Sequence, residues 1–138
     1  MARSGNIFHF SFPVFSGYLE HAVPAYKYLL RNCLESIHPE PLVKTSGLPS
    51  FGQVTVTRQG ARTMVHLLTY LPELRGKQQI IEEPVSVREV LLRLRTGDGK
   101  VKTAYLAPSR ERLAIQYRNG YAEVVVPEIN GYQMVIFE

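Results

Sequence analysis

The sequence predicts a mostly β chain, α+β overall, in which a seven-strand antiparallel β-sandwich follows one strand and one amphipathic helix. From residue 53 onward, short runs rich in Val, Thr and Leu alternate with glycine and asparagine turn signals, the pattern of a sandwich or barrel. Ahead of them, only residues 24–37 space their apolar side chains as a helix does. The chain has 138 residues, of which 45% are hydrophobic, enough for one hydrophobic core and a small attached unit.

The first predicted element is a strand near the N-terminus. Phe8, Phe10 and Phe12 recur at period two within residues 6–15, which is the spacing of side chains on one face of a strand. Pro13 ends this run, because proline cannot donate a backbone hydrogen bond to a neighbouring strand. We therefore expect one strand that leads into a loop.

The second predicted element is an amphipathic helix over residues 24–37. Pro24 suits the first turn of a helix, and Pro39 prevents the helix from continuing. Charged side chains lie on the opposite side from the apolar residues, as in a helix with one buried face. The apolar face consists of Tyr26, Leu29, Leu30, Cys33, Leu34 and Ile37.

The segment that follows, residues 38–50, is predicted to be an extended connector. Three prolines and Gly47 within it rule out a regular element for most of its length. We place the domain boundary here. Residues 1–48 then form a strand–helix segment, and residues 49–138 form the C-terminal β-sandwich domain.

Two hairpins are expected to open the sandwich. The first joins residues 53–58 to residues 62–70, with a glycine between them for the tight reversal. The second joins residues 86–95, whose apolar residues recur at period two, to residues 101–106. The turn of this second hairpin is Thr96-Gly97-Asp98-Gly99.

The third hairpin has the strongest local signal, because Asn119-Gly120 is the dipeptide that a two-residue type I′ turn requires. A shift of one residue would turn its apolar side chains to water, so the turn fixes the pairing of the two strands. The expected pairs are Arg118 with Tyr121, Tyr117 with Ala122, Gln116 with Glu123, Ile115 with Val124, and Leu113 with Val126.

A last strand over residues 132–137 completes the count of seven. Asn130-Gly131 turns the chain into this strand, and Tyr132, Met134 and Ile136 share one of its faces. No internal repeat of solenoid length and no low-complexity segment interrupts the series.

Charge and hydropathy argue against nucleic-acid and membrane partners. The formal net charge is +4, but the basic residues of the second half are interleaved with acidic ones, as on a solvated sheet face. The uninterrupted apolar runs, such as residues 124–126, are far shorter than the roughly 20 residues of a membrane-spanning helix. Residues 1–5 do not open a secretory signal, and localisation stays open because an excised fragment would lack its signal. The interleaved basic residues are Arg88, Arg93, Arg95, Lys100, Lys102, Arg110, Arg112 and Arg118.

No metal-binding or cofactor-binding residue is expected. His9, His21, His38 and His66 are scattered, without the spacing that places ligands together on a metal. Cys33 is the only cysteine, so neither an internal disulfide nor a cysteine zinc site can form. Its position in the apolar helical stripe predicts a small buried side chain. No Gly-rich phosphate loop or dinucleotide fingerprint is present, and no cofactor is expected.

No catalytic residue is expected either. His66 shares a strand face with Met64 and Leu68, which predicts a core histidine with one satisfied hydrogen bond rather than a catalytic base. Glu82 and Glu83 are the only adjacent carboxylates, and neighbours in an extended segment point to opposite faces. A glycosidase holds its two carboxylates across one sugar bond. We therefore interpret this pair as part of a solvated loop or edge.

The tyrosines support one alternative, a sugar-binding surface. Their rings can stack on sugars, but tyrosine is also a common strand residue and the chain has no tryptophan. Ligand-binding residues are therefore left unassigned. The tyrosines are Tyr18, Tyr26, Tyr28, Tyr70, Tyr105, Tyr117, Tyr121 and Tyr132.

Several passages resemble the C-terminal region of bacterial β-galactosidase-like or hypothetical glycoside hydrolases. Residues 66–72 (HLLTYLP), with residues 80–83 (IIEE) following, are similar to the HLLNYVP … IIED passage near the end of those proteins. Residues 124–138 resemble their closing strands, VxVPxLxxYxMVxxE. Residues 12–18, the helix and residues 48–50 look like the last strand and helix of their amidotransferase-like trimerisation domain.

The resemblance implies a non-catalytic C-terminal accessory and assembly module of a β-galactosidase-like glycoside hydrolase, inactive as a separate chain. In such enzymes an N-terminal (β/α)₈ barrel carries both catalytic carboxylates, and no position of this chain matches them. The implied partners are that barrel and further copies in a homo-oligomer. Because the chain starts within the α/β unit, its strand and helix lack their usual sheet and would pack on the β domain or on another copy. The alternative function is a carbohydrate-binding β-sandwich module.

Overall fold

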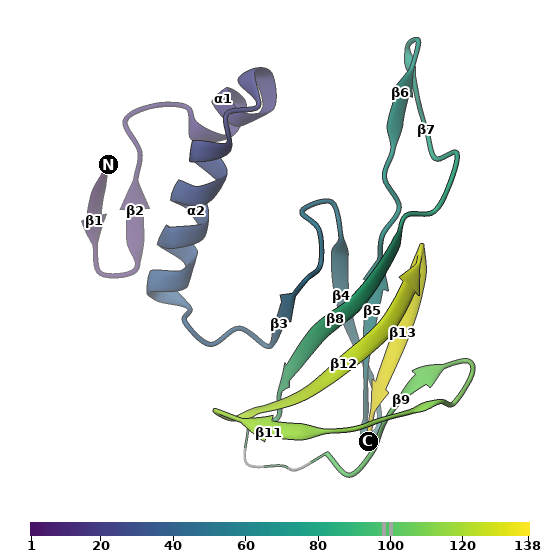
Figure 1. Ribbon diagram of the computed structural model, residues 1–138. Helices are drawn as coiled ribbons and strands as arrows, with labels where there is room; N and C mark the ends of the chain where they lie inside the picture. Colours follow the sequence, from purple (N-terminus) through teal and green to yellow (C-terminus); the bar gives the residue numbers. More distant parts are fainter. Residues whose placement is uncertain (98, 100) are drawn as a thin grey trace. The chain divides into compact units, whose positions relative to one another are not determined.

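The computed structural model describes residues 1–97, 99 and 101–138, which form two compact units, Met1–Pro41 and Leu42–Glu138 (Figure 1). Strands make up most of the regular structure, so the mostly β class is confirmed. Asp98, in the turn predicted at residues 96–99, lies outside the described residues, as does Lys100.

The N-terminal strand of the prediction is part of a hairpin. β1 (Ala2–Ser4) pairs antiparallel with β2 (Ile7–His9), and Gly5, with φ +58°, lies in the turn between them. The strand ends earlier than the period-two phenylalanines suggest. Phe12 lies beyond it, and its ring packs against the ring of Tyr26 with centroids 5.8 Å apart. Phe10 and Phe12 were predicted to continue the strand. Instead, their rings contact each other, and Phe12 packs on Tyr26 of α2.

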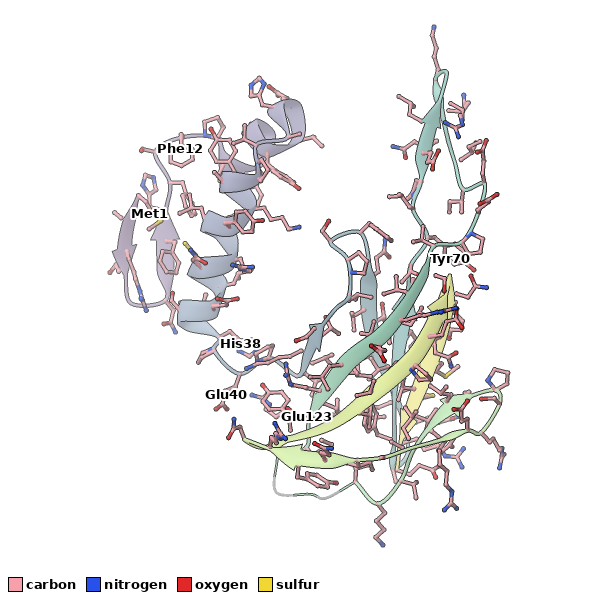
Figure 2. All side chains as sticks on the ribbon, in the orientation of Figure 1. Met1, Phe12, His38, Glu40, Tyr70 and Glu123 are labelled. Atoms are coloured by element: carbon pink, nitrogen blue, oxygen red, sulfur yellow. The ribbon has the colours of Figure 1, made fainter. Side chains whose placement is uncertain are left out.

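The first unit contains two helices, where the sequence predicts one. α1 (Val14–His21) is the additional helix, and α2 (Pro24–Ile37) has the predicted bounds. Val14 and Cys33 are the buried apolar residues of this unit. Figure 2 labels Met1 at the start of this unit, and its Sδ atom lies 3.7 Å from the Sγ atom of Cys33 in the structure. The buried interpretation of Cys33 is confirmed.

The second unit is a two-layer sandwich built on one hydrogen-bonded network of nine strands, rather than the seven expected. Its strands are β3 (Val43–Ser46), β4 (Gln53–Gln59), β5 (Arg62–Leu68), β8 (Ser86–Arg95), β9 (Ala104–Ala107), β10 (Arg112–Leu113), β11 (Gln116–Arg118), β12 (Tyr121–Asn130) and β13 (Tyr132–Phe137). β12 and β13 pair with each other only at Asn130 and Tyr132, so the network divides into two halves at this corner. One half has the order β10-β9-β13-β5-β4 and the other the order β11-β12-β8-β3.

The two halves share one hydrophobic core. Over most of each central strand, buried side chains alternate with exposed or half-buried ones, as expected for strands with one face on a core and one on solvent. All the core side chains are at most 5% exposed. They are Val65, Leu67, Ala104, Leu106, Val135 and Phe137 from the first half, and Val90, Leu92, Leu94, Ala122, Val124, Val126 and Ile129 from the second.

The Asn119-Gly120 hairpin has the predicted register near its turn only. Both turn residues have positive φ, 48° and 78°, and β11 and β12 form the first three expected pairs. The pairs of Ile115 and Leu113 with β12 are wrong, because Leu113 belongs to β10 and pairs with Ala104 of β9. Both apolar side chains pack against the core as the chain passes between the halves. The turn therefore fixes the nearest pairs, and core packing decides the rest.

The second predicted hairpin is wrong as a pairing. β8 pairs with β12 along its whole length and with β3 on its other side, whereas β9 pairs with β13 and β10. The segment after β8 thus carries the chain to the opposite half instead of reversing it. Long antiparallel pairing with β12 buries Val90, Leu92 and Leu94, which a local hairpin with the short β9 would not do.

Two further elements were not predicted. β3 lies in the expected connector and pairs with β8, so the first compact unit ends at Pro41, before the boundary placed after residue 48. β6 (Glu73–Arg75) and β7 (Gln78–Ile80) form a hairpin that projects from the sandwich (Figure 1). We call it the β6–β7 arm. All its residues are exposed, which explains why hydrophobic patterning gave no signal for it.

Thr69 ties together three segments at the corner between β12 and β13. Its side chain is fully buried. The Oγ1 hydroxyl donates to the carbonyl of Val85 at 2.7 Å and accepts from the N–H of Gly131 at 3.1 Å. The N–H of Thr69 donates to the carbonyl of Gly131 at 2.7 Å. These bonds satisfy buried backbone groups where the sheet ladder is interrupted.

Gly131→Ala is expected to destabilise the chain more than Gly60→Ala. Both glycines have positive φ, 76° and 58°, which costs about 1–2 kcal/mol for alanine. At Gly131 the added Cβ would also lie 2.7 Å from Cε1 of Tyr70, whereas at Gly60 it would meet nothing within 4 Å. Displacing the Tyr70 ring should add about 1 kcal/mol. Urea unfolding followed by circular dichroism measures the difference, and equal losses would contradict the close approach of Tyr70.

Candidate functional site

The outer face of the half β10-β9-β13-β5-β4 carries a set of polar side chains that bond to one another across the strands. Strand register places one residue from each strand in a single row across this face, on the side opposite the core. That row consists of Thr57, Met64, Ile136, Tyr105 and Arg112. Arg62, Glu138 and Thr103 follow beside it, because the backbones of Glu138 and Thr103 exchange hydrogen bonds of 2.9 and 3.0 Å.

His66 lies on this outer face and not in the core. Its Nε2 is 2.9 Å from Oγ1 of Thr57, and its Nδ1 is 2.8 Å from the hydroxyl of Tyr132. The imidazole also stacks on the Tyr132 ring, with centroids 6.0 Å apart. A hydroxyl can donate or accept, so both ring nitrogens are satisfied in either neutral tautomer. The expectation of a core position with one hydrogen bond is therefore wrong, but the structural role expected for His66 fits.

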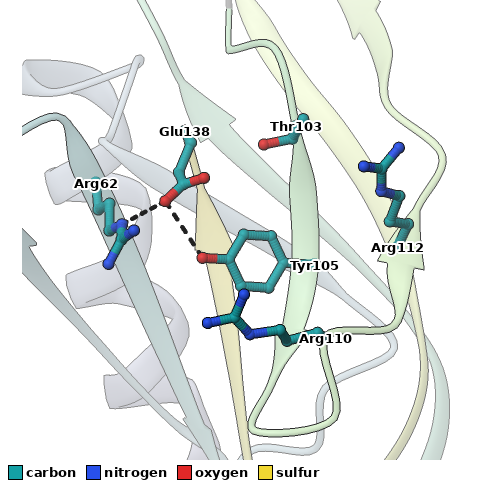
Figure 3. Close-up of a pocket in the computed structure, with 6 residues that line it drawn as sticks. All are labelled: Arg62, Thr103, Tyr105, Arg110, Arg112 and Glu138. Atoms are coloured by element: carbon teal, nitrogen blue, oxygen red, sulfur yellow. Dashed lines mark hydrogen bonds and ion pairs between the residues drawn. The ribbon is translucent and has the colours of Figure 1, made fainter.

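A pocket of about 340 Å³ opens at the end of the outer face (Figure 3). Glu138 forms an ion pair with Arg62 and accepts a hydrogen bond of 3.3 Å from the hydroxyl of Tyr105. Among the described residues, the guanidinium groups of Arg110 and Arg112 form no ion pair. The side chains of the pocket therefore include three guanidinium groups and one carboxylate, a composition suited to binding an anion. We call it the arginine pocket, lined by Arg62, Thr103, Tyr105, Arg110, Arg112 and Glu138.

Sequence reasoning missed this pocket because no local pattern marks it. Arg62 and Glu138 are 76 positions apart, and they meet only because β5 pairs with β13. Arg110 and Arg112 were assigned to a solvated sheet face on the basis of interleaved charge. Only the pairing of β9 with β13 and β10 brings all of them to one place.

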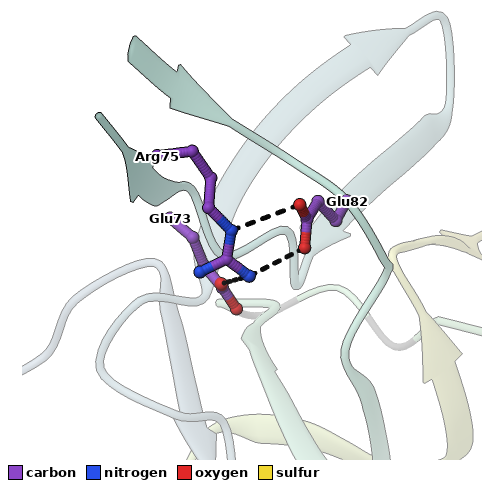
Figure 4. A network of polar contacts seen from close by, with 3 residues as sticks. All are labelled: Glu73, Arg75 and Glu82. Atoms are coloured by element: carbon purple, nitrogen blue, oxygen red, sulfur yellow. Dashed lines mark hydrogen bonds and ion pairs between the residues drawn. The ribbon is translucent and has the colours of Figure 1, made fainter. Parts of the chain in front are cut away.

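The carboxylate pair of the sequence analysis lies just after the β6–β7 arm. Glu82 accepts two hydrogen bonds from Arg75, of 2.8 and 3.2 Å, and Glu73 pairs with the same guanidinium at 2.8 Å (Figure 4). The Arg75 hydrogen bond lowers the pKa of Glu82. Glu82 and Glu83 are both exposed, so the interpretation as a solvated segment is confirmed.

Arg75→Gln is expected to raise the pKa of Glu82. Because that pKa is lowered in the folded chain, the contact stabilises the arm above the unfolded pKa of about 4.3, and this contribution is lost as pH falls through the folded pKa. Carboxyl NMR titration should give a lower midpoint for Glu82 in the wild type than in the variant. Arg88→Gln, which removes a partner of Glu128 instead, should leave the Glu82 midpoint unchanged. Equal midpoints in wild type and Arg75→Gln would contradict the contact.

The tyrosines are distributed over both units. Tyr18, Tyr26 and Tyr28 belong to the helices of the first unit, and Tyr121 is buried in the second. Tyr105 lines the arginine pocket and Tyr132 stacks on His66, whereas Tyr70 follows β5 beside Gly131 and Tyr117 lies on β11 in the other half. The structure therefore does not assemble the eight rings into one platform.

The other histidines lie at element ends. His9 ends β2, His21 ends α1 beside Glu20, and His38 follows α2. Within residues 1–97, 99 and 101–138, no three His, Cys, Asp or Glu side chains gather as metal ligands. In the same residues, no helix has the length and apolar content to cross a membrane.

Comparison with known proteins gives structural matches only. No family model and no curated protein sequence matches the chain. α-L-Fucosidase isoenzyme 2 from Paenibacillus thiaminolyticus matches 91% of this chain, with a TM-score of 0.84 and 30% sequence identity. A cycloisomaltooligosaccharide glucanotransferase from Paenibacillus sp., solved in complex with cycloisomaltoheptaose, matches 69% with a TM-score of 0.55 and 15% identity, which shows the fold alone.

These matches cover 19% of the fucosidase chain and 16% of the glucanotransferase chain, so this sequence spans about a fifth or less of either protein. The chain is thus a β-rich domain related to a part of a glycoside hydrolase. Neither matched protein is named a β-galactosidase, so the resemblance is supported at the level of glycoside hydrolases and not of the β-galactosidase-like group.

Proposed function

We propose that this β-rich domain, related to part of a glycoside hydrolase, is a non-catalytic accessory module of a larger enzyme. The observation that supports this most directly is the match to the fucosidase, which spans 91% of this chain but only 19% of that one. In a protein of that length the catalytic residues can lie outside the matched part. The domain would then support the enzyme without taking part in the reaction. The β-galactosidase-like character of the parent rests on the sequence resemblance, and the fucosidase match makes an α-L-fucosidase parent an equal proposal.

The carboxylates of the sandwich unit fit a supporting role. A glycosidase needs one carboxylic acid that keeps its proton until it protonates the leaving group. Arg75 lowers the pKa of Glu82, and Ser86 followed by Arg88 lowers the pKa of Glu128. The lowered pKa keeps Glu82 and Glu128 ionised at neutral pH, so neither carboxylate is suited to act as a general acid.

An assay of the 138-residue chain tests this proposal. Nitrophenyl α-L-fucoside and nitrophenyl β-galactoside, incubated with the purified chain, should release nitrophenol no faster than buffer does. The P. thiaminolyticus fucosidase serves as the positive control for the first substrate. Saturable turnover that follows the chain through purification would overturn the accessory role.

The β6–β7 arm supports an assembly function, with the parent's catalytic barrel or a further copy of the chain as partner. An isolated two-stranded hairpin is only marginally stable in water. Leu74 on the arm and Ile81 just after it are 67% and 51% exposed, and apolar groups on a projecting hairpin favour docking onto another surface. In the first unit, Phe15 and Leu19 are 72% and 85% exposed and support the same proposal.

Light scattering at several concentrations tests self-assembly. We expect a mass above that of the monomer at high concentration, reduced in Leu74→Ser. Gln79→Ser is the matched control, because Gln79 is the cross-strand partner of Leu74 and is polar already. A strict monomer at every concentration would overturn the homo-oligomer and leave the catalytic barrel as the proposed partner.

A carbohydrate-binding role is the second proposal, supported by Tyr132, which is 41% exposed on the outer face. Titration calorimetry against galactosides and fucosides should then show binding that Tyr132→Ala removes and Tyr117→Ala leaves intact. Tyr117 is similarly exposed, at 43%, and lies on β11 in the other half. The absence of heat across the panel at millimolar sugar would exclude this role.

A further inference from the structure

The arginine pocket combines features of a ligand site that neither the core nor the outer-face packing explains. Its lining comes from β5, from β9 with the residue before it, from the β9–β10 turn, from β10 and from the end of the chain after β13. We propose that it binds an oxyanion group, a carboxylate or a sulfate, carried by a ligand the size of a monosaccharide. The proposal does not depend on the activity of the parent protein.

Sheet register fixes the floor of the pocket. Arg112 pairs with Tyr105 across β10 and β9, and Tyr105 pairs with Ile136 of β13. Arg62, Glu138 and Thr103 lie beside this row through the backbone pairing of β5, β13 and the segment before β9. Strand pairing fixes the backbone spacing of these residues, and the Tyr105 hydroxyl donates to Glu138, the partner of Arg62, at the centre of the pocket (Figure 3).

The charge of the pocket is not balanced internally. Glu138 neutralises Arg62, which leaves Arg110 and Arg112 without a carboxylate partner in the described part of the chain. Glu111, between them in sequence, lines a different depression together with Pro127 and Glu128. Guanidinium groups offer paired N–H donors that match the oxygens of carboxylate and sulfate, and Tyr105 and Thr103 add hydroxyls. A bound oxyanion would supply the acceptor oxygens that these donors lack within the pocket.

The backbone at Arg110 is held in a conformation that arginine disfavours. Its φ is +61°, and its N–H donates to the carbonyl of Leu106 at 2.8 Å, while the N–H of Leu106 donates to the carbonyl of Glu111 at 2.8 Å. These two bonds define the β9–β10 turn. A glycine would suit this φ better, and the turn in this conformation holds the Arg110 side chain among those that line the pocket.

The size of the pocket limits the ligand. A volume of about 340 Å³ lies at the lower end of the range of small-molecule sites, which start at about 300 Å³. It accommodates one sugar ring with a charged substituent, with the Tyr105 ring as an apolar wall. A free inorganic oxyanion would use the guanidinium groups alone, and the experiment separates these two sources.

NMR titration of the ¹⁵N-labelled 138-residue chain tests the proposal. Sodium sulfate, sodium glucuronate and neutral galactose are added separately, with ionic strength held constant by sodium chloride. We expect saturable amide shifts in residues 103–112 with glucuronate and none with galactose. Saturation by glucuronate, with or without sulfate, supports a sugar-borne oxyanion, whereas saturation by sulfate alone would overturn it in favour of a free inorganic oxyanion.

Charge variants give opposite expected changes. Arg112→Gln and Arg110→Gly should each weaken glucuronate binding about five- to tenfold, the loss of one charge-assisted contact at an exposed site. Glu138→Gln should tighten binding about two- to fivefold, because it removes the competing carboxylate and releases Arg62. The matched control is Arg58→Gln. Arg58 is an exposed arginine of β4 whose cross-strand partner is Thr63, and it does not line the pocket.

Arg110→Gly also distinguishes loss of binding from loss of folding. Glycine relieves the strained φ, so the unfolding temperature should stay the same or rise while glucuronate binding weakens. Shifts that rise linearly with all three solutes, or equal losses in Arg58→Gln and Arg112→Gln, would overturn the proposal. Weaker binding by Glu138→Gln would overturn it as well.

Discussion

Phe137→Ala is expected to lower the free energy of unfolding by about 3–5 kcal/mol, the cost of an unfilled cavity at a buried aromatic position. Phe137 is 1% exposed and lies where β13 pairs with both β5 and β9. Its ring therefore fills core space next to β5 and β9, two strands that pair with β13 but are distant from it in the sequence. Urea unfolding followed by far-UV circular dichroism measures the loss, since the chain has no tryptophan for fluorescence.

Ile136→Ala is the matched control for Phe137→Ala. Ile136 is the preceding residue of the same strand, but its side chain lies on the outer face and is half-buried, so we expect a loss of about 1 kcal/mol. Similar losses for both variants would contradict the assignment of faces on β13. The sequence alone does not decide this, because both residues are apolar.

Thr69→Val is expected to lower the free energy of unfolding by about 2–4 kcal/mol, although valine has nearly the same shape. The hydroxyl of Thr69 bonds both the carbonyl of Val85 and the N–H of Gly131. Valine leaves both backbone groups without this partner, and an unsatisfied buried polar group costs about 1–3 kcal/mol. The same urea unfolding experiment measures the loss.

Two further variants isolate the hydroxyl of Thr69. Thr69→Ser keeps the donor and acceptor and should lose only about 1 kcal/mol, the contribution of one methyl group. Thr55→Val makes the same chemical change on the exposed outer side of β4 and should stay within about 0.5 kcal/mol of the wild type. A loss for Thr69→Ser as large as that for Thr69→Val would show that packing, rather than hydrogen bonding, holds this corner.

The sequence by itself determined the elements whose signals are local. The helix over residues 24–37 begins and ends as its prolines require, and the first hairpin and the Asn119-Gly120 turn form with the expected pairs near the turn. These features depend on backbone sterics and helical or two-residue periodicity within one segment. They are therefore readable from residues that are neighbours in the chain.

Tertiary structure decided which strands pair and which side chains meet. β8 pairs with β12 and β3 rather than with β9, and residues 112–118 divide between the two halves, because burial of the shared core outweighs the local turn preference. The same pairing of β5, β13 and β9 brings Arg62, Tyr105 and Glu138 into one pocket from distant positions. Residues 103–112 supply four of its side chains from one segment, but Arg62 and Glu138 reach them only through strand pairing, which no spacing in the sequence encodes.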